Sequence, residues 1–367
     1  MHRVHLTYRL GARDDLPPAA GVLAHPLFAL LAAIHDVGSI AAAARRLGLS
    51  YRHVWGELKR WEIELGHALV HWVKGQPALL TAFGEKLLWA EARAQARLAP
   101  QIEALCSELE RAFAIAFDDS ASVLTLYASH DSALPALREL AARTHNLHLD
   151  VRFTGSVDAL AALNAGRCAV AGFHALTDTT LRSPTARVFR PLLRPGLHKL
   201  LGFARRTQGL IVPAGNPQGI AALSDLTRAG VRLANRAQGA GSRVLLDELF
   251  ARSRIDTASI SGYAGGEPSH EAAAAAVASG QADVAFGVEP AARRRGLHFI
   301  ALVEERYFLV CLRGALDEPP LRALREVLAG AAWREALATL PGYSPGDAGA
   351  VLPLARVLPW WRYRRPK

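Results

Sequence analysis

The sequence predicts an α/β multidomain protein: a small all-α N-terminal domain, a long helix, and then an α/β domain. Three observations support this fold class. The chain has 367 residues, which is too long for one ordinary domain. Apolar residues recur at helical spacing as far as Phe117. Beyond Asp118-Asp119-Ser120 strands alternate with helices, a pattern that predicts a parallel sheet with crossover helices.

Composition narrows the class of protein. Hydrophobic residues make up 51% of the chain, enough for full cores, and the formal charge is +10. This charge favours nucleic acid or another anion as partner, with an ordinary solvated surface as the open alternative. Three scattered cysteines without a CxxC pair, no apolar leader and no run of about 18 apolar residues predict a cytoplasmic protein that makes no membrane contact.

The first three predicted helices form one motif. Residues 26–34 read as a helix with Pro26 in its first turn. Ser39 is placed to cap a second helix ending near Leu47, and Ser50 is placed to cap a third, residues 51–65. A helix, a short turn that contains glycine, and then a basic helix make up the helix-turn-helix pattern. The second helix of this pattern enters the major groove of DNA. A two-stranded wing is expected over residues 69–81. The predicted DNA contacts are Ser39, Ser50, Tyr51, Arg52, His53, Lys59, Arg60 and, at the wing tip, Lys74.

A long amphipathic helix is expected from Phe83 to about Phe117, kinked or divided by Pro100. A partner helix from a second copy is the favoured use of its apolar stripe, and packing onto its own domain is the alternative. The predicted domains are therefore 1–82 for DNA binding, 83–118 for linkage and dimerisation, and 119–367 for the α/β part.

Three loops of small residues each lie between a predicted strand and a predicted helix, at 128–131, 154–156 and 238–243. Free backbone N–H groups and hydroxyls at helix N-termini bind anions, so three converging loops predict an anion site; ordinary helix capping is the alternative for each loop alone. Flanking side chains could clamp the anion through charge-assisted hydrogen bonds. The expected ligand residues are Ser129, His130, Asp131, Gly155, Ser156, Asn235, Arg236, Gly241, Ser242 and Arg243.

Enzyme motifs are weak throughout. The loop at 238–243 fails both GxGxxG and the P-loop pattern, and GxSxG is absent. His67 and His71 lack a third ligand, and the adjacent His130 and Asp131 are poorly placed for a general-base pair. We therefore predict no enzyme, no metal site and no cofactor.

Residues 38–66, GSIAAAARRLGLSYRHVWGELKRWEIELG, resemble the winged helix of ModE-type and LysR-type transcriptional regulators. The Ser50-Tyr51 start and Trp55 are nearer to the ModE type, but the small β domain that binds molybdate in that family does not follow here. Residues from about 120 onward resemble a type II periplasmic-binding-protein-like domain, on stretches such as 128–131, 206–210, 235–243 and 278–287.

This resemblance implies two α/β lobes, with lobe two at about 206–300, and a ligand cleft between them. Ser129 and Gly155-Ser156 would lie on one wall and Gly241-Ser242 on the other. Closure of the cleft would change the geometry of the attached helices. Because relatives of this domain bind molybdate or tungstate, the resemblance favours a metal oxyanion as effector.

Together these inferences predict a ligand-responsive DNA-binding transcriptional regulator that acts as a homodimer, or a higher oligomer, on a double-stranded operator with a small anionic effector. Two alternatives stay open. One is a LysR-like regulator that senses a small organic acid. The other is a molybdenum-cofactor-related enzyme or oxyanion-binding protein with the head as an interaction module.

Overall fold

The computed structural model describes residues 25–73, 76–118 and 120–361, and the chain divides into two compact units, Met1–Ala99 and Pro100–Lys367. Among the described residues no single helix is long and apolar enough to cross a membrane. One bent pair, α1 (Pro26–Val37) with α2 (Ile40–Arg46), passes that test by length and composition only. The apolar residues of this pair form much of the core of the first unit.

The first unit is the predicted helix-turn-helix with a wing. Helices α1 and α2 pack with α3 (Tyr51–Leu65), and β1 (Val70–His71) pairs antiparallel with β2 (Leu79–Leu80). The Ser39 Oγ accepts a hydrogen bond from Ala42 N at 3.3 Å, and the Ser50 Oγ accepts one from His53 N at 3.1 Å. Both serines are therefore the helix caps that the sequence predicts, because each satisfies an orphan N–H of a first turn.

Helix α4 (Ala82–Phe117) runs from the first unit into the second, with Pro100 inside it at the boundary. Within the second unit the Ser107 Oγ donates to Leu149 O at 3.0 Å and accepts from Val151 N at 3.3 Å. These bonds fix this part of α4 along β4 (Leu147–Phe153), which is a terminal strand of the large sheet. Such a cover protects an exposed sheet edge from unwanted pairing.

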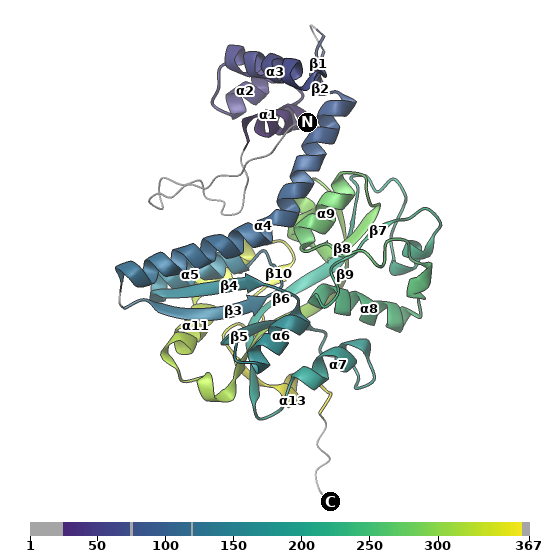
Figure 1. Cartoon of the computed structure of the whole chain (residues 1–367). Coiled ribbons are helices and arrows are strands. Elements are labelled where there is room, and N and C mark those ends of the chain that lie inside the picture. The colour runs from purple at the N-terminus through teal and green to yellow at the C-terminus, as the bar shows by residue number, and fades with distance from the viewer. Residues whose placement is uncertain (1–24, 74–75, 119, 362–367) are drawn as a thin grey trace, which may run out of the picture. The chain divides into compact units, whose positions relative to one another are not determined.

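The second unit is built on a nine-stranded mixed sheet with strand order β4-β3-β5-β9-β6-β8-β7, and β10 and β11 pair with β6 (Figure 1). The remaining strands are β3 (Ser122–Ala128), β5 (Val170–Ala175), β6 (His198–Val212), β7 (Leu233–Ala234), β8 (Val284–Val288), β9 (His298–Leu312), β10 (Tyr343–Ser344) and β11 (Val351–Pro353).

Two long strands join the halves of this sheet. β6 and β9 have 15 residues each and pair antiparallel along their length. β5 pairs antiparallel with one end of β9, and β8 pairs antiparallel with the far end of β6. The expected parallel pairing is right within each half, for β3 with β4 and β5 and for β7 with β8, but wrong at the centre. The result is the two-lobed architecture expected from the resemblance.

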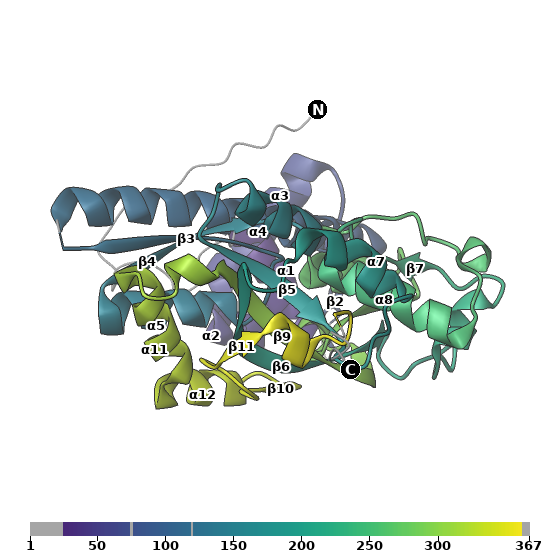
Figure 2. The same cartoon turned by 90° about the horizontal axis from the view of Figure 1, so that it is seen from below.

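Helices cover both faces of the sheet (Figures 1 and 2). One core packs α5, α9, α10, α11 and α12 against one face; α6, α7 and α13 cover the other face in lobe one, and α8 packs in lobe two. The bounds are α5 (Leu134–His145), α6 (Ser156–Asn164), α7 (Pro184–Phe189), α8 (Gly241–Ser253), α9 (His270–Ala278), α10 (Glu289–Arg293), α11 (Pro319–Ala329), α12 (Ala331–Ala338) and α13 (Leu354–Val357). Short 3-10 turns include η2 (Arg190–Leu192).

Candidate functional site

One face of α3 carries the predicted DNA-contacting side chains. Val54 and Leu58 are buried in the core of the first unit, at 0% and 2% exposure. The predicted contact residues of this helix all lie exposed: Tyr51, Arg52, His53, Lys59 and Arg60. The helix therefore presents a polar, basic surface opposite its buried stripe, as a recognition helix requires.

The cations on this face differ in what they already contact. The Lys59 Nζ lies 2.6 Å from Glu62 Oε2 and 5.0 Å from the centre of the Trp55 ring. The Arg60 guanidinium lies 2.6 Å from Glu57 Oε2, which holds the pKa of that carboxyl below its usual range. Neither Arg52 nor His53 makes a side-chain ion pair with a described residue. Arg52 is therefore the α3 arginine whose charge is most available to a phosphate or a base.

Contacts from α3 also fix the wing. The Glu62 Oε1 accepts hydrogen bonds from Leu69 N at 2.9 Å and Val70 N at 3.4 Å, at the start of β1. The Trp55 ring meets the Trp72 ring edge-on at 5.4 Å. Wing and recognition helix are thus joined by a carboxylate and an aromatic pair. Lys74, the predicted tip contact, lies outside the described residues.

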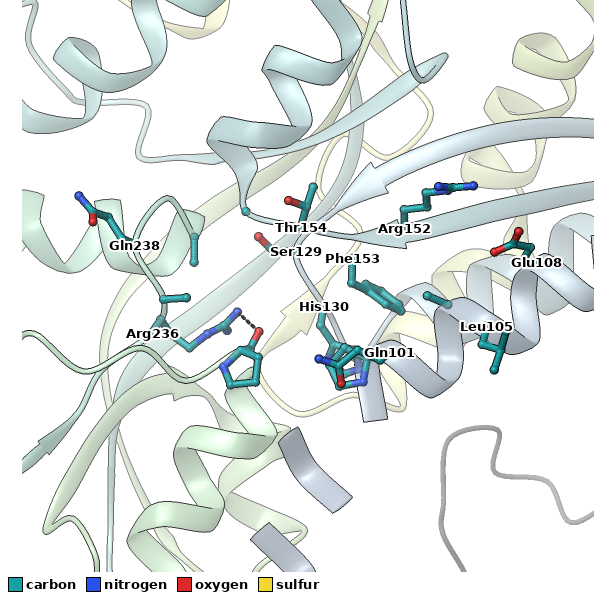
Figure 3. Close-up of a pocket in the computed structure, with 16 residues that line it drawn as sticks. Gln101, Leu105, Glu108, Ser129, His130, Arg152, Phe153, Thr154, Arg236 and Gln238 are labelled. Carbon is teal, nitrogen blue, oxygen red and sulfur yellow. Dashed lines mark hydrogen bonds between the residues drawn. The ribbon is translucent and has the colours of Figure 1, made fainter. Parts of the chain in front are cut away.

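The second unit contains a cavity of about 510 Å³ (Figure 3). Its walls come from α4, from the end of β4 with the loops that follow β3 and β4, and from the loop that follows β7 together with Pro268 before α9. Lobe one, lobe two and α4 thus meet around one space. The lining residues are Pro100, Gln101, Ala104, Leu105, Glu108, Ser129, His130, Arg152, Phe153, Thr154, Gly155, Arg236, Ala237, Gln238, Ala240 and Pro268.

Four predicted ligand residues line this cavity: Ser129, His130, Gly155 and Arg236. The other six are not on its wall: Asp131, Ser156, Asn235, Gly241, Ser242 and Arg243. Five of these six are buried polar or charged residues, and the sixth is Gly241. The loops do approach one another, as the sequence predicts. A Cβ on Gly155 would lie 2.7 Å from Gly239 O, and one on Gly241 would lie 2.9 Å from Ser156 Oγ.

Arg236 is the buried arginine among the residues that line the cavity, and it faces the same space as Ser129 (Figure 3). It is 3% exposed, and its Nε and Nη2 donate to Glu267 O at 3.1 Å and Pro268 O at 3.0 Å. Its Nη1 has no acceptor among the described residues, and the buried Ser129 Oγ has no hydrogen-bond partner there either. Burial, together with the positive charge of Arg206, lowers the pKa of Arg236 to about 9.

A buried polar network joins Asp131, one of the predicted ligand residues, to Arg206, Glu305 and Tyr343, which the sequence does not predict as site residues. The Arg206 Nε lies 2.6 Å from Glu305 Oε1, and the same guanidinium pairs with Asp131. Tyr343 donates its hydroxyl hydrogen to Asp131 Oδ2 at 2.8 Å. Asp131 is therefore held by the protein itself. The only signal in the sequence is that Arg206 and Glu305 each sit in a polar interruption of an apolar run.

The network continues into lobe two. The Gln208 Nε2 donates to Glu305 Oε1 at 2.6 Å and to Ser242 Oγ at 3.2 Å, and Ser242 Oγ lies 3.1 Å from His270 Nε2. His174 Nδ1 lies 3.1 Å from Arg206 Nη2. Burial, with the charges of Arg206 and Arg236, holds the pKa of both His174 and His270 well below the usual range, so both are neutral at pH 7.

Two protein families match the chain. Residues 137–329 match the PBP superfamily domain, and residues 27–85 match the bacterial regulatory helix-turn-helix protein, lysR family. The first range runs from α5 to the end of α11 in the second unit, and the second range holds the helix-turn-helix with its wing.

Similar proteins were found in both sequence and structure comparisons. The uncharacterized protein YvgK of Bacillus subtilis (strain 168) is 34% identical over 201 residues, 55% of this chain, and the match spans 64% of that protein, just under two thirds. An uncharacterized protein in the 5′ region of a 2Fe-2S ferredoxin gene of Clostridium pasteurianum is 34% identical over 110 residues, 30% of this chain and 97% of that protein. A mutant of Corynebacterium glutamicum OxyR has a TM-score of 0.44 at 17% identity, covering 85% of this chain and 93% of that one.

Proposed function

We propose that the chain, which belongs to the PBP superfamily and joins that domain to a LysR-family helix-turn-helix, is a LysR-type DNA-binding transcriptional regulator rather than an enzyme. We propose further that a small anion in the cavity of the second unit is its effector. We place the regulator in the cytoplasm, as a homodimer on a double-stranded operator.

One observation carries the effector proposal: Arg236 is a buried cation with a donor left over. Two of its guanidinium nitrogens are satisfied by backbone carbonyls, and Nη1 is not. A buried charged group that lacks a partner is costly, and an anion in the cavity would remove that cost. The Ser129 hydroxyl on the same wall offers a second donor to the same ligand.

The cavity favours an organic acid over a bare oxyanion. Its volume of about 510 Å³ falls in the range typical of small-molecule sites, about 300–1,000 Å³. Apolar side chains such as Leu105, Phe153 and Pro268 form part of its wall, and they would contact a hydrocarbon body. Molybdate or tungstate is the second candidate, supported by the hydroxyl and guanidinium donors at the Arg236 end of the cavity.

Isothermal titration calorimetry of the full-length protein with molybdate, tungstate, sulfate and a series of small carboxylates tests the effector. We expect heat with a carboxylate, and its loss in Arg236→Gln and Ser129→Ala. Arg254→Gln, an exposed arginine of lobe two, is the control that should bind as the native protein does. Binding that survives in Arg236→Gln would refute the proposed site, and heat with molybdate or tungstate alone would select the metal oxyanion.

For the DNA face, we propose that Arg52 and His53 contact the operator from the start of α3, with Tyr51 and Ser50 beside them. Lys59 and Arg60 would contribute charge while they also hold Glu62 and Glu57. Phosphate contacts position such a helix, whereas contacts to base edges give sequence selectivity.

Arg52→Ala tests this assignment. Loss of one direct contact should weaken operator binding by about 1–3 kcal/mol for a base contact, or lower the salt slope by about 1 for a phosphate contact. A gel-shift titration over a range of salt measures both, and size-exclusion chromatography should show an unchanged oligomer. Arg46→Ala, whose side chain pairs with Asp36, is the control within the same unit. An unchanged operator affinity and slope would remove Arg52 from the interface.

A further inference from the structure

The second unit carries a group of exposed arginines that do not line the cavity. Residues 179–224 contain seven Lys or Arg and no Asp or Glu. Arg205 and Arg206 of this stretch are paired with Glu304 and Glu305 on β9. Four others are exposed and lie on or beside α7 and η2: Arg182, Arg187, Arg190 and Arg194. We name these four the α7 arginines.

The fold makes this an outward-facing surface. Ala186 and Phe189 of α7, with Leu193 just after η2, pack into the core of lobe one and leave the intervening arginines outside. None of the four makes an ion pair with a described residue. The acids next to α7 are already engaged, because Arg252 lies 3.1 Å from Glu248 and 2.9 Å from Asp178. The positive charge of this surface is therefore not neutralised by its neighbours.

The last described residues of the chain lie in the same core as α7. Trp360 packs against Phe173 in the core that also holds α7, and its Nε1 donates to Thr179 Oγ1 at 2.9 Å. Figure 1 shows α13 and α7 close together. The sequence after Trp361 adds further cations, which lie outside the described residues: Arg362, Arg364, Arg365 and Lys367. The described part of the chain thus ends beside α7, and the sequence that follows it is basic.

We infer that the α7 arginines form a second DNA-contacting surface, which binds the phosphate backbone without sequence preference. Arg187, Arg190 and Arg194 place three exposed positive charges within a short stretch of chain, where like charges repel one another, and an anionic partner relieves this repulsion. Guanidinium groups match phosphate oxygens with paired hydrogen bonds. DNA is the partner favoured, because the head of the chain holds DNA close and so raises its local concentration.

The salt dependence of DNA binding tests this surface. The measurement is the affinity of the full chain for a duplex of random sequence, titrated between about 50 and 200 mM salt. Each phosphate contact contributes about 0.9 to the slope of log K against log salt. The triple variant Arg187→Gln, Arg190→Gln, Arg194→Gln should lower the magnitude of the slope by about 2.7. The corresponding triple Lys variant keeps the charges and should keep the slope.

A matched control removes the same charge elsewhere. Arg143, Arg322 and Arg334 are exposed on α5, α11 and α12, where acids such as Glu139 and Glu326 stand on the same helices. Their triple Gln variant should leave the slope unchanged. Equal slopes for the two Gln triples would overturn the inference, whether the arginines face an acidic protein or only solvent. Operator preference, which depends on α3, should survive in both, so this result is separate from the test of Arg52.

Discussion

At the residue scale, the titration of Arg236 links the chemistry of the cavity to a measurable pH dependence. Burial and the charge of Arg206 lower its pKa to about 9, so the guanidinium begins to lose its proton as the pH rises through that value. An anion binds the protonated form only, because neutral Arg236 offers no charge to compensate for the desolvation of the ligand. Affinity for the proposed anionic effector should therefore be constant near pH 7 and fall above about pH 9.

Calorimetry from pH 7 to 10, with the anion that gives heat at pH 7, measures this fall. Arg236→Lys is an informative partner variant, because its ammonium also loses its charge when buried and should shift the fall to lower pH. An affinity that stays flat up to pH 10 in the native protein would contradict the role of Arg236 as the ligand's counter-charge.

At this scale the sequence pattern brings part of the cavity wall together. Ser129, His130, Gly155 and Arg236 follow strands at their carboxyl ends, so the strand-loop-helix pattern was enough to place them on the wall. It could not place the wall that α4 contributes, because the packing of Ser107 on β4 joins segments more than 40 residues apart. Ser129 and Asp131 are two residues apart in one loop, yet one lines the cavity and the other pairs with Arg206.

At the element scale, the long strands β6 and β9 show why the apolar pattern of the sequence does not predict the full length of the central strands. The apolar pattern predicts strands only at 209–212, 299–303 and 307–311, because Arg205-Arg206 and Glu304-Glu305 interrupt it. In the structure these interruptions face each other, with Arg206 paired in register with Glu305. A buried ion pair therefore sits where periodicity predicts a loop, and only the partner strand reveals it.

Breaking this pair should cost much more than breaking its exposed neighbour. Arg206→Met leaves the carboxylates of Glu305 and Asp131 buried without their cation, and loss of one partner of a buried pair costs about 3–5 kcal/mol. Arg205→Met on the same strand removes the pair with Glu304, where the two side chains are 42% and 56% exposed, and should cost about 1 kcal/mol or less. Urea unfolding of both variants measures the difference, and equal losses would show that the buried network does not stabilise the centre of the sheet.

At the scale of the whole molecule, the fold was more predictable than the ligand chemistry. The helix-turn-helix depends on local features, the caps Ser39 and Ser50 and the turn at Gly48, so its helices came out within a few residues of their true bounds. The antiparallel centre of the sheet depends on pairing between residues about 100 positions apart, which no local pattern encodes. The choice between an oxyanion and an organic acid depends on the volume of a cavity, which only the assembled fold provides.

The neutral histidines at the centre of the second unit should make the folded chain sensitive to acid. His174 and His270 have pKa values well below 6.5 when folded, because they are buried next to Arg206 and Arg236. Below about pH 6.5 the unfolded chain binds protons that the folded chain does not, so the free energy of unfolding falls with pH, by about 1.4 kcal/mol per unit for each histidine. Urea unfolding between pH 7 and 5 should show a steeper loss in the native protein than in His174→Gln, while the exposed His67→Gln matches the native slope. Carboxylates contribute equally to all three proteins, so identical slopes would mean that His174 is protonated in the folded state and that the buried network accepts the added charge.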